Sequence, residues 1–147
     1  MQSNSCIHQL EATRRFGVSR IYCGVPVSKK TLLCVDDELI GLKVRKIILE
    51  RQGYEVLTAS EGQEGLHVFQ EHDVDAVVLD YYMPGIDGGA VASVMKKTKP
   101  GVPIILLSAY VTLPESVIAS VDAFITKGDS PEVLIGKIAE LTETRPC

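Results

Sequence analysis

Polar residues stand directly after four apolar runs of the sequence, and their types suit the chemistry of a phosphoryl group. They are Asp36 and Asp37, Asp80, Ser108 and Lys127. Clustered carboxylates raise one another's pKa unless a cation lies among them, and carboxylate oxygens without Cys or His ligands suit Mg²⁺. A carboxylate can also attack phosphorus and form an aspartyl phosphate. The set therefore suggests a magnesium site beside one reactive carboxylate.

The residue types assign a role to each member of this set. Asp80 is the candidate nucleophile, because it ends the buried run Ala76–Leu79. Asp36 and Asp37 would hold Mg²⁺, one directly and one through water, with Asp80 as a third ligand. Charge on the transferring phosphoryl oxygens needs further partners. Lys127 would pair with one of these oxygens, and Ser108 would donate a hydrogen bond to another.

Each of these residues also has an ordinary structural explanation. Asp36 could cap the helix that follows it, and the dipole of that helix would favour Asp37. Asp80 could cap a turn, and Ser108 could be satisfied by local backbone. Lys127 could be a solvated loop residue. We prefer the functional interpretation because the structural one requires five separate coincidences.

The elements that would position these residues alternate between strand and helix patterns. Short apolar runs predict strands at residues 31–35, 54–59, 76–80, 102–107 and 123–126. Apolar residues at helical spacing predict five helices, one after each strand. This alternation implies an α/β fold, with a parallel sheet covered by helices on both faces. The carboxyl ends of such strands meet at one edge, where open α/β sheets bind their ligands.

Turn and capping residues predict where several helices begin or end. Gly53 can stop the first helix, which the apolar residues from Leu39 onward indicate. Thr112 is the expected N-cap of the fourth helix, with Pro114 in its first turn. Ser130 is the expected cap of the last helix.

Composition bounds the class of protein. The 147 residues carry a net charge of −4, and they show no basic stripe typical of nucleic-acid binding. No apolar run is long enough to span a bilayer, and no glycine-rich loop predicts a nucleotide cofactor. No cysteine pair has metal-binding spacing, which favours a reduced cytoplasmic setting. The cysteines are Cys6, Cys23, Cys34 and Cys147.

The periodic pattern divides the chain into one domain and two flanking segments. Residues 29–143 carry the pattern, and residues 144–147 form a short stub, so we expect either a domain that acts alone or a fragment of a larger protein. Residues 1–28 lack the pattern and are richer in arginine than in acid. They could be a flexible tail, a short helix around residues 7–16, a segment added by an upstream start codon, or a transit peptide. The last of these explanations has the least support.

Residues of about 29 to 143 resemble the receiver domain of two-component response regulators. The matching motifs are Asp36-Asp37-Glu38, Asp80-Tyr81-Tyr82-Met83-Pro84-Gly85-Ile86-Asp87-Gly88, Ser108-Ala109, and Lys127 with Phe124 before it. The resemblance implies a flavodoxin-like, doubly wound five-stranded parallel sheet of order 2-1-3-4-5 with five helices. It also implies transfer of a phosphoryl group from a phosphohistidine of a histidine kinase to Asp80, followed by slow self-hydrolysis.

The resemblance implies further roles and partners. The backbone carbonyl of Tyr82 would supply a Mg²⁺ ligand, and Ser108 and Phe124 would form a switch. A histidine kinase or phosphotransfer protein would be the donor. The face made by the fourth helix, fifth strand and fifth helix would contact a downstream protein, and phosphorylation-dependent homodimers are a further option. The chain would then be a signalling protein and no enzyme beyond its own Mg²⁺-dependent phosphorylation and dephosphorylation.

The sequence departs from the family pattern after Lys127. The family usually has a cis proline there, whereas this chain has Gly128. A cis bond before a residue other than proline costs about 3–4 kcal/mol, so both a trans bond and a constrained cis bond remain open. Tyr82 and Tyr110 are bulky neighbours of the site, and we expect them to screen the acyl phosphate from water.

Two other functions compete with the phosphorylated receiver. One is a receiver-shaped interaction module that works without phosphorylation, against which the intact set of site residues argues. The other is a hydrolase with an aspartyl-phosphate intermediate. A hydrolase would need a second acid two residues beyond Asp80, where this chain has Tyr82, and a cap domain that the chain lacks.

Overall fold

The computed structural model describes Ile21–Tyr22, Val25–Pro26 and residues 29–110 and 112–143. Five strands form the main sheet: β3 (Thr31–Val35), β4 (Glu55–Ala59), β5 (Ala76–Asp80), β6 (Ile104–Ser108) and β7 (Ala123–Thr126). Helices follow the strands: α2 (Leu39–Arg51), α3 (Gly62–Glu71), α4 (Gly88–Thr98), α5 (Glu115–Ala119) and α6 (Pro131–Glu143). The predicted strand–helix alternation is therefore confirmed.

The main sheet is parallel throughout, with the strand order β4-β3-β5-β6-β7. Counting only these five strands, the order is 2-1-3-4-5, as the family resemblance implies. Strand β4 pairs with one edge of β3, and β5, β6 and β7 extend the sheet from the other edge of β3. The order reverses between β3 and β5, and a crevice opens at the carboxyl ends of strands at such a reversal.

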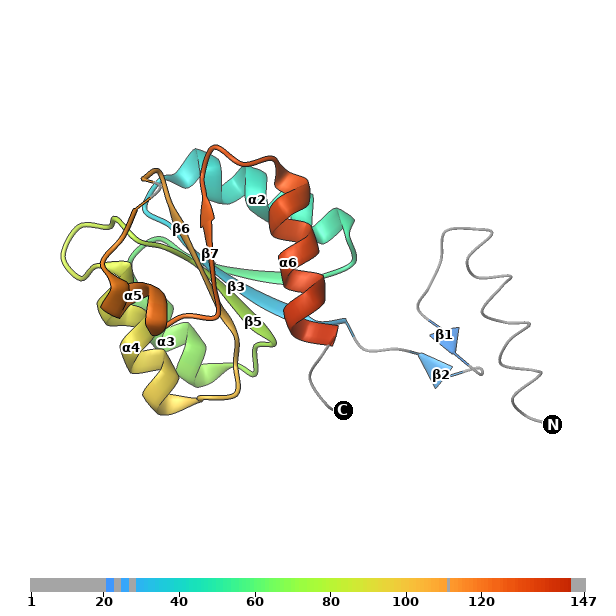
Figure 1. The fold of residues 1–147 in the computed structure, drawn as a ribbon. Coiled ribbons are helices and arrows are strands. Elements are labelled where there is room, and N and C mark those ends of the chain that lie inside the picture. Colours follow the sequence, from blue (N-terminus) through green and yellow to red (C-terminus); the bar gives the residue numbers. More distant parts are fainter. Residues whose placement is uncertain (1–20, 23–24, 27–28, 111, 144–147) are drawn as a thin grey trace.

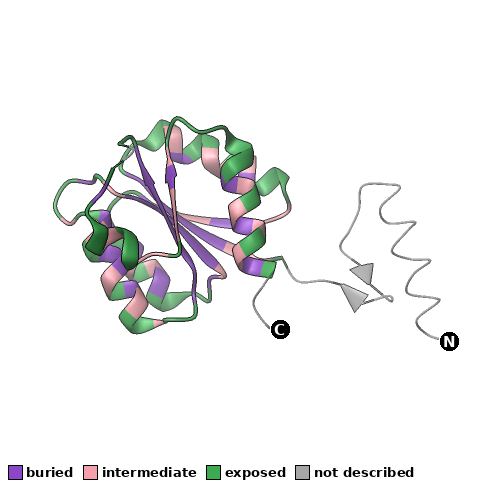
Figure 2. Ribbon diagram, in the orientation of Figure 1, coloured by how far each residue is buried: buried purple, intermediate pink, exposed green. Residues whose placement is uncertain are grey.

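Two helical layers cover the sheet. Helices α2 and α6 lie on one face, and α3, α4 and α5 lie on the other (Figure 1). Alternate residues of β3 divide between the two cores: Leu33 and Val35 pack toward Phe69 of α3, whereas Leu32 and Cys34 pack toward Leu49 of α2. Every residue of β5 and β6 is buried, as expected for central strands of a two-sided sheet (Figure 2).

Several element boundaries differ from the sequence prediction. Strand β4 begins at Glu55 rather than at residue 54. Strand β6 runs Ile104–Ser108 rather than 102–107, because pairing with β7 continues through Ser108. The predicted cap Thr112 was wrong, since α5 begins at Glu115 with Pro114 at its N-cap and no side-chain cap bond. Proline has a fixed φ and disfavours helical backbone in the preceding residue, which accounts for the later start.

A short hairpin precedes the main sheet. Strands β1 (Ile21–Tyr22) and β2 (Val25–Pro26) pair antiparallel and form a sheet of their own, which the sequence did not predict. The expected helix around residues 7–16 and the stub at 144–147 lie outside the described residues. Among the residues that the structure describes, no helix is long and apolar enough to cross a membrane.

Candidate functional site

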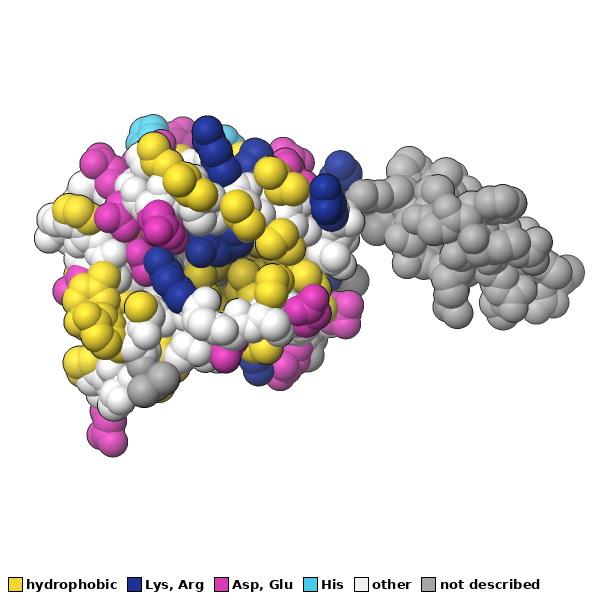
Figure 3. Space-filling model, turned by 90° about the horizontal axis from the view of Figure 1, so that it is seen from above, with side chains coloured by type: hydrophobic (Ala, Val, Ile, Leu, Met, Phe, Trp, Pro, Cys, Tyr) yellow, Lys and Arg dark blue, Asp and Glu magenta, His cyan; other side chains and the backbone are white. Residues whose placement is uncertain are grey.

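The carboxyl edge of the main sheet brings together the polar residues that the sequence singled out. Asp36 directly follows β3, and Asp80 ends β5. Asp80 pairs with Leu107 of β6, so Ser108 stands one residue further along the neighbouring strand. Ser108 in turn pairs with Thr126, and Lys127 comes next. The register thus carries residues from four segments to one edge. Viewed from above, the molecule shows acidic and basic side chains together at a hollow with hydrophobic walls (Figure 3).

Lys127 is the centre of an ion-pair network at this edge. Its Nζ lies 3.1 Å from Asp80 Oδ1 and 3.3 Å from Asp36 Oδ2. Both carboxylate side chains are buried, at 5% and 0% exposed, whereas the lysine side chain is 27% exposed. We call Asp36, Asp37, Asp80 and Lys127 the acidic site. The cation is held between two carboxylates, where a transferred phosphoryl oxygen would also need positive charge.

The three charged groups of this network have shifted pKa values. Burial and the neighbouring charge of Asp36 raise the pKa of Asp80 to about 6, against the opposing effect of Lys127. Although burial alone would raise the pKa of Asp36, the Glu38 N–H and the charges of Lys127 and Arg45 hold it below its ordinary value. Burial lowers the pKa of Lys127, but the carboxylates of Asp80 and Asp36 raise it by more. Of the two buried carboxylates in this network, Asp80 is therefore the one whose negative charge is less well balanced by its surroundings.

The donor set of the acidic site fits a hard divalent cation. Carboxylate oxygens of Asp36, Asp37 and Asp80 lie within 4.8 Å of one another. The first and third residues are buried, and Asp37 is exposed to solvent. An all-oxygen set with one open side matches Mg²⁺, which retains waters and takes few protein carboxylates. The three carboxylates supply the oxygen ligands that Mg²⁺ prefers, so these residues can hold this ion.

The loop after β5 fixes the position of Asp80. Gly88 N donates to Tyr81 O at 2.7 Å, and a Cβ on Gly88 would lie 2.4 Å from the carbonyl oxygen of Asp80. Asp87 Oδ1 accepts a hydrogen bond from Ala90 N at 2.9 Å and caps α4. Only glycine allows the start of α4 to approach the Asp80 backbone this closely, so the Asp87-Gly88 pair sets the loop geometry.

The remaining predicted residues lie around the acidic site. Ser108 is buried, and its Oγ accepts a hydrogen bond from Tyr110 N at 3.0 Å, which is the local backbone contact considered for it above. Its hydroxyl hydrogen is still available as a donor. Phe124 is half-buried and packs against the core on the α3–α4–α5 face. Tyr82 follows Asp80 by two residues and is 58% exposed, with its ring 5.2 Å from that of Tyr110.

The peptide bond that links Lys127 to Gly128 is trans, since no peptide bond among the described residues is cis. Of the two isomers that the sequence left open, the trans bond is the one present. The backbone N–H of Lys127 donates to Ser108 O at 2.8 Å, so the sheet itself fixes the lysine. A Cβ added to Gly128 would have no atom within 4 Å other than those of its chain neighbours. The lysine therefore reaches Asp36 and Asp80 without a cis proline after it.

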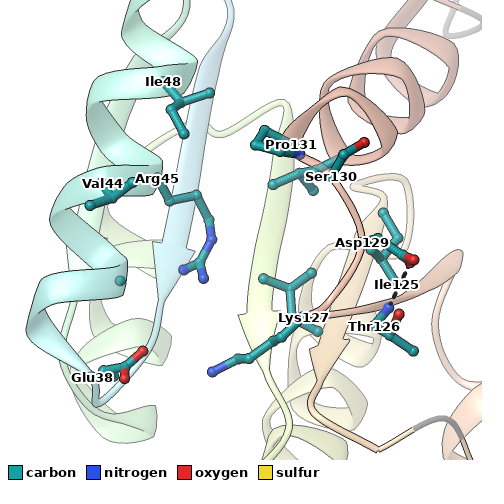
Figure 4. Close-up of a pocket in the computed structure, with 13 residues that line it drawn as sticks. Glu38, Val44, Arg45, Ile48, Ile125, Thr126, Lys127, Asp129, Ser130 and Pro131 are labelled. Carbon is teal, nitrogen blue, oxygen red and sulfur yellow. Dashed lines mark hydrogen bonds between the residues drawn. The ribbon is translucent and has the colours of Figure 1, made fainter.

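The structure adds one residue that the sequence analysis missed. Arg45 Nη1 lies 3.3 Å from Asp36 Oδ2. Arg45 also lines a pocket of about 330 Å³ between α2, the end of β7 and α6. In Figure 4 the side chains of Arg45 and Lys127 enter this space from opposite sides. The sequence does carry a signal for Arg45. It is a basic residue between the apolar positions 42 and 49 of one helix face.

Comparison with known proteins gives matches over almost the whole main sheet. A family profile described as the response regulator receiver domain matches residues 32–139. The transcriptional regulatory protein GlrR of Escherichia coli is 36% identical over 115 residues, which cover 76% of this chain and 26% of that protein. The probable transcriptional regulator ycf27 of Cyanophora paradoxa is 35% identical over 118 residues, covering 78% of this chain and 49% of that protein. The chain spans about a quarter to a half of the length of these curated relatives.

Solved structures match at similar levels of identity. A CheY-like receiver domain protein from Methanospirillum hungatei has a TM-score of 0.74 at 32% identity and is matched over 79% of this chain and 95% of its own. The response regulator protein TrrA from Thermotoga maritima was crystallised in complex with Mg²⁺ and BeF. It has a TM-score of 0.73 at 36% identity, over 76% of this chain and 98% of its own.

Proposed function

The chain belongs to the response regulator receiver domain family of two-component systems, and we propose that it accepts a phosphoryl group on Asp80. The family is one of signalling proteins, and we expect no catalysis beyond the chain's own phosphorylation and dephosphorylation. The observation that carries the proposal is the position of Lys127 Nζ, 3.1 Å from Asp80 Oδ1 and 3.3 Å from Asp36 Oδ2. A buried carboxylate beside further carboxylates and a cation suits attack on phosphorus.

In the proposed reaction, a carboxylate oxygen of Asp80 attacks the phosphorus of a phosphohistidine in a histidine kinase or phosphotransfer protein. The bond from phosphorus to the donor nitrogen breaks as the bond to the Asp80 oxygen forms. Lys127 shifts its pairing from Asp80 to a phosphoryl oxygen, and Ser108 donates its hydroxyl hydrogen to another. Asp36, Asp37, Asp80 and the Tyr82 carbonyl would hold Mg²⁺, which neutralises charge on the phosphoryl oxygens.

The proposed output is a change at the surface near β7. Ser108 would turn its hydroxyl from Tyr110 N toward the phosphoryl group, and Phe124 would move further into the core. The face formed by α5, β7 and α6 would then contact a downstream protein or a second copy of the chain. Relatives named as transcriptional regulators support an output of this kind, although the chain covers only part of their length. A cytoplasmic location remains a prediction from the cysteine pattern.

The proposal is tested by incubating the protein with acetyl phosphate and Mg²⁺ and measuring its intact mass. We expect one phosphoryl group on the wild type and none on Asp80→Asn. Asp73→Asn is the matched control, because Asp73 is an exposed acid just before β5 and outside the acidic site. Lys127→Met is expected to slow phosphorylation severely, since the phosphoryl oxygens lose their protein cation.

Beryllofluoride with Mg²⁺ provides an independent test, and the complex of TrrA with Mg²⁺ and BeF supports its use here. We expect the wild type to gain thermal stability from both additives together and Asp80→Asn to gain none. Absence of both phosphorylation and the beryllofluoride effect in the wild type would contradict the proposal. That result would favour the interaction module that works without phosphorylation.

A further inference from the structure

Arg45 is a charged residue in an apolar stripe. It lies three residues after Leu42 and four before Leu49, so it shares the helix face of these two buried side chains. Its own side chain is only 14% exposed. A guanidinium group in such a place needs a partner, because burial of an unpaired charge is costly.

Its partner is a residue of the acidic site. Arg45 Nη1 and Lys127 Nζ each lie 3.3 Å from the same oxygen, Asp36 Oδ2. The other oxygen, Oδ1, accepts a hydrogen bond from Glu38 N at 2.9 Å. Both oxygens of this carboxylate are therefore engaged, although Asp36 is one of the three residues that can hold a divalent cation.

The second cation changes the charge of the site. When its three carboxylates are ionised, Lys127 alone would leave a net charge of −2, whereas Lys127 and Arg45 together leave −1. The attraction for a divalent cation is proportional to that charge, and it is strong where the groups are buried. Arg45 must therefore weaken the attraction of the site for such a cation.

Arg45 also has space to move and a second carboxylate within reach. The pocket of about 330 Å³ lies on its open side, with Glu38 on the wall (Figure 4). A Cβ on Gly41 would lie 2.7 Å from Glu38 Oε1 and 4.0 Å from Arg45 Nη2, so both charged groups border this glycine. Glu38 is therefore a second carboxylate beside the guanidinium group, on the side of the pocket.

We infer that Arg45 is a resident, displaceable cation of the magnesium site. It pairs with Asp36 in the metal-free protein, lowers the affinity of the site for Mg²⁺, and turns toward Glu38 when the ion binds. Arg45 is a positioning residue rather than a catalytic one, since it acts through Asp36. The inference rests on the proposed function only in that both concern the same metal site.

The test is a titration with MgCl₂ alone, at fixed pH and ionic strength, followed by tyrosine fluorescence. The chain has no tryptophan, and two of its five tyrosines, Tyr82 and Tyr110, follow Asp80 and Ser108 by two residues each, so part of the signal reports on the site. We expect Arg45→Met to bind Mg²⁺ about tenfold more tightly than the wild type, because one opposing charge near the ion is removed. Arg45→Lys keeps the charge and is expected to stay within about threefold of the wild type.

Lys43→Met is the matched control. It removes the same charge from an exposed position of the same helix, and its Mg²⁺ affinity should stay within about twofold of the wild type because exposed charges are screened. If Arg45→Met is too unstable to titrate, Glu38→Gln serves in its place. Removal of the alternative partner should weaken Mg²⁺ binding, and Asp129→Asn, on the far wall of the pocket, should weaken it less.

The outcomes separate this inference from the proposed function. Equal Mg²⁺ affinity of Arg45→Met and the wild type, with normal phosphorylation of Asp80, overturns only the role of Arg45. Tighter binding by Arg45→Met without any phosphorylation supports that role and contradicts the proposed function. If no variant binds Mg²⁺, both are overturned. The difference in melting temperature between saturating Mg²⁺ and EDTA provides a second measure of affinity for each variant.

Discussion

At the scale of single residues, the carboxyl group of Asp80 is held where its charge is disfavoured. Its pKa is about 6 in the folded protein against a reference value of 3.8. Between these values the folded state binds more protons than the unfolded state, so the free energy of unfolding falls as the pH rises through this window. Above it, the ionised carboxylate opposes folding in the absence of a metal.

Asp80→Asn should therefore stabilise the metal-free protein. We expect the free energy of unfolding in EDTA to rise by about 1–2 kcal/mol at about pH 7.5, and the gain to disappear near pH 4. This expected gain already allows for the attraction between Asp80 and Lys127 that the substitution removes. Urea unfolding followed by circular dichroism measures both values. Asp73→Asn should show no such pH-dependent gain, and an equal gain in that control would contradict the explanation.

The two exposed tyrosines beside the site give a second prediction. The rings of Tyr82 and Tyr110 lie 5.2 Å apart, and Tyr81 packs on Tyr82 at 4.9 Å. We expect these rings to limit the approach of water to a phosphoryl group on Asp80. The double change Tyr82→Ala and Tyr110→Ala should speed the loss of phosphate several-fold, as measured by intact mass after the donor is removed. An unchanged rate would show that the rings do not screen the site.

At the scale of elements, the start of α4 is packed directly against the end of β5. A methyl group on Gly88 would lie 2.4 Å from the carbonyl oxygen of Asp80 and 2.8 Å from Tyr81 Cα. Gly88→Ala should therefore destabilise the protein by about 1–3 kcal/mol, because backbone must shift to admit the side chain. Denaturant unfolding measures the loss.

Gly136 provides the contrast for that prediction. It lies exposed within α6, and a Cβ there would contact nothing within 4 Å. Gly136→Ala should raise stability by roughly 0.5–1 kcal/mol, since alanine is the better helix former. A similar effect of both substitutions would mean that the close contact at Gly88 does not determine the loop geometry.

At the scale of the whole molecule, we expect the main sheet and its five helices to form the folding unit. All strands of this sheet and all elements of both cores lie within residues 29–143, and the hairpin β1–β2 forms a separate sheet. We expect a protein of residues 29–143 to melt within about 4 °C of the full chain, a change of less than about 1 kcal/mol. It should also bind Mg²⁺ with unchanged affinity. A larger loss of stability would show that residues 1–28 or 144–147 contribute to the stability of the domain.

Much of the fold could be predicted from the sequence because the relevant signals are local. Buried strands such as Ala76–Asp80 are continuous apolar runs, and each ends at the first polar residue. Boundaries were less predictable where proline acts, as at the start of α5, because the effect depends on the backbone of its neighbours. The hairpin strands Ile21–Tyr22 and Val25–Pro26 were not predicted, because each has only two residues and is too short to form such a run.

The sequence alone determined which residues could meet at the carboxyl edge of a parallel sheet, because strand ends and residue types are local properties of the chain. Only the tertiary structure decided how their charges interact. The contact of Lys127 with Asp36 joins residues 91 positions apart, and Arg45 reaches the same oxygen from a helix face that reads as core. Distance through space and burial set the strength of such pairs, and neither quantity can be read from the order of residues.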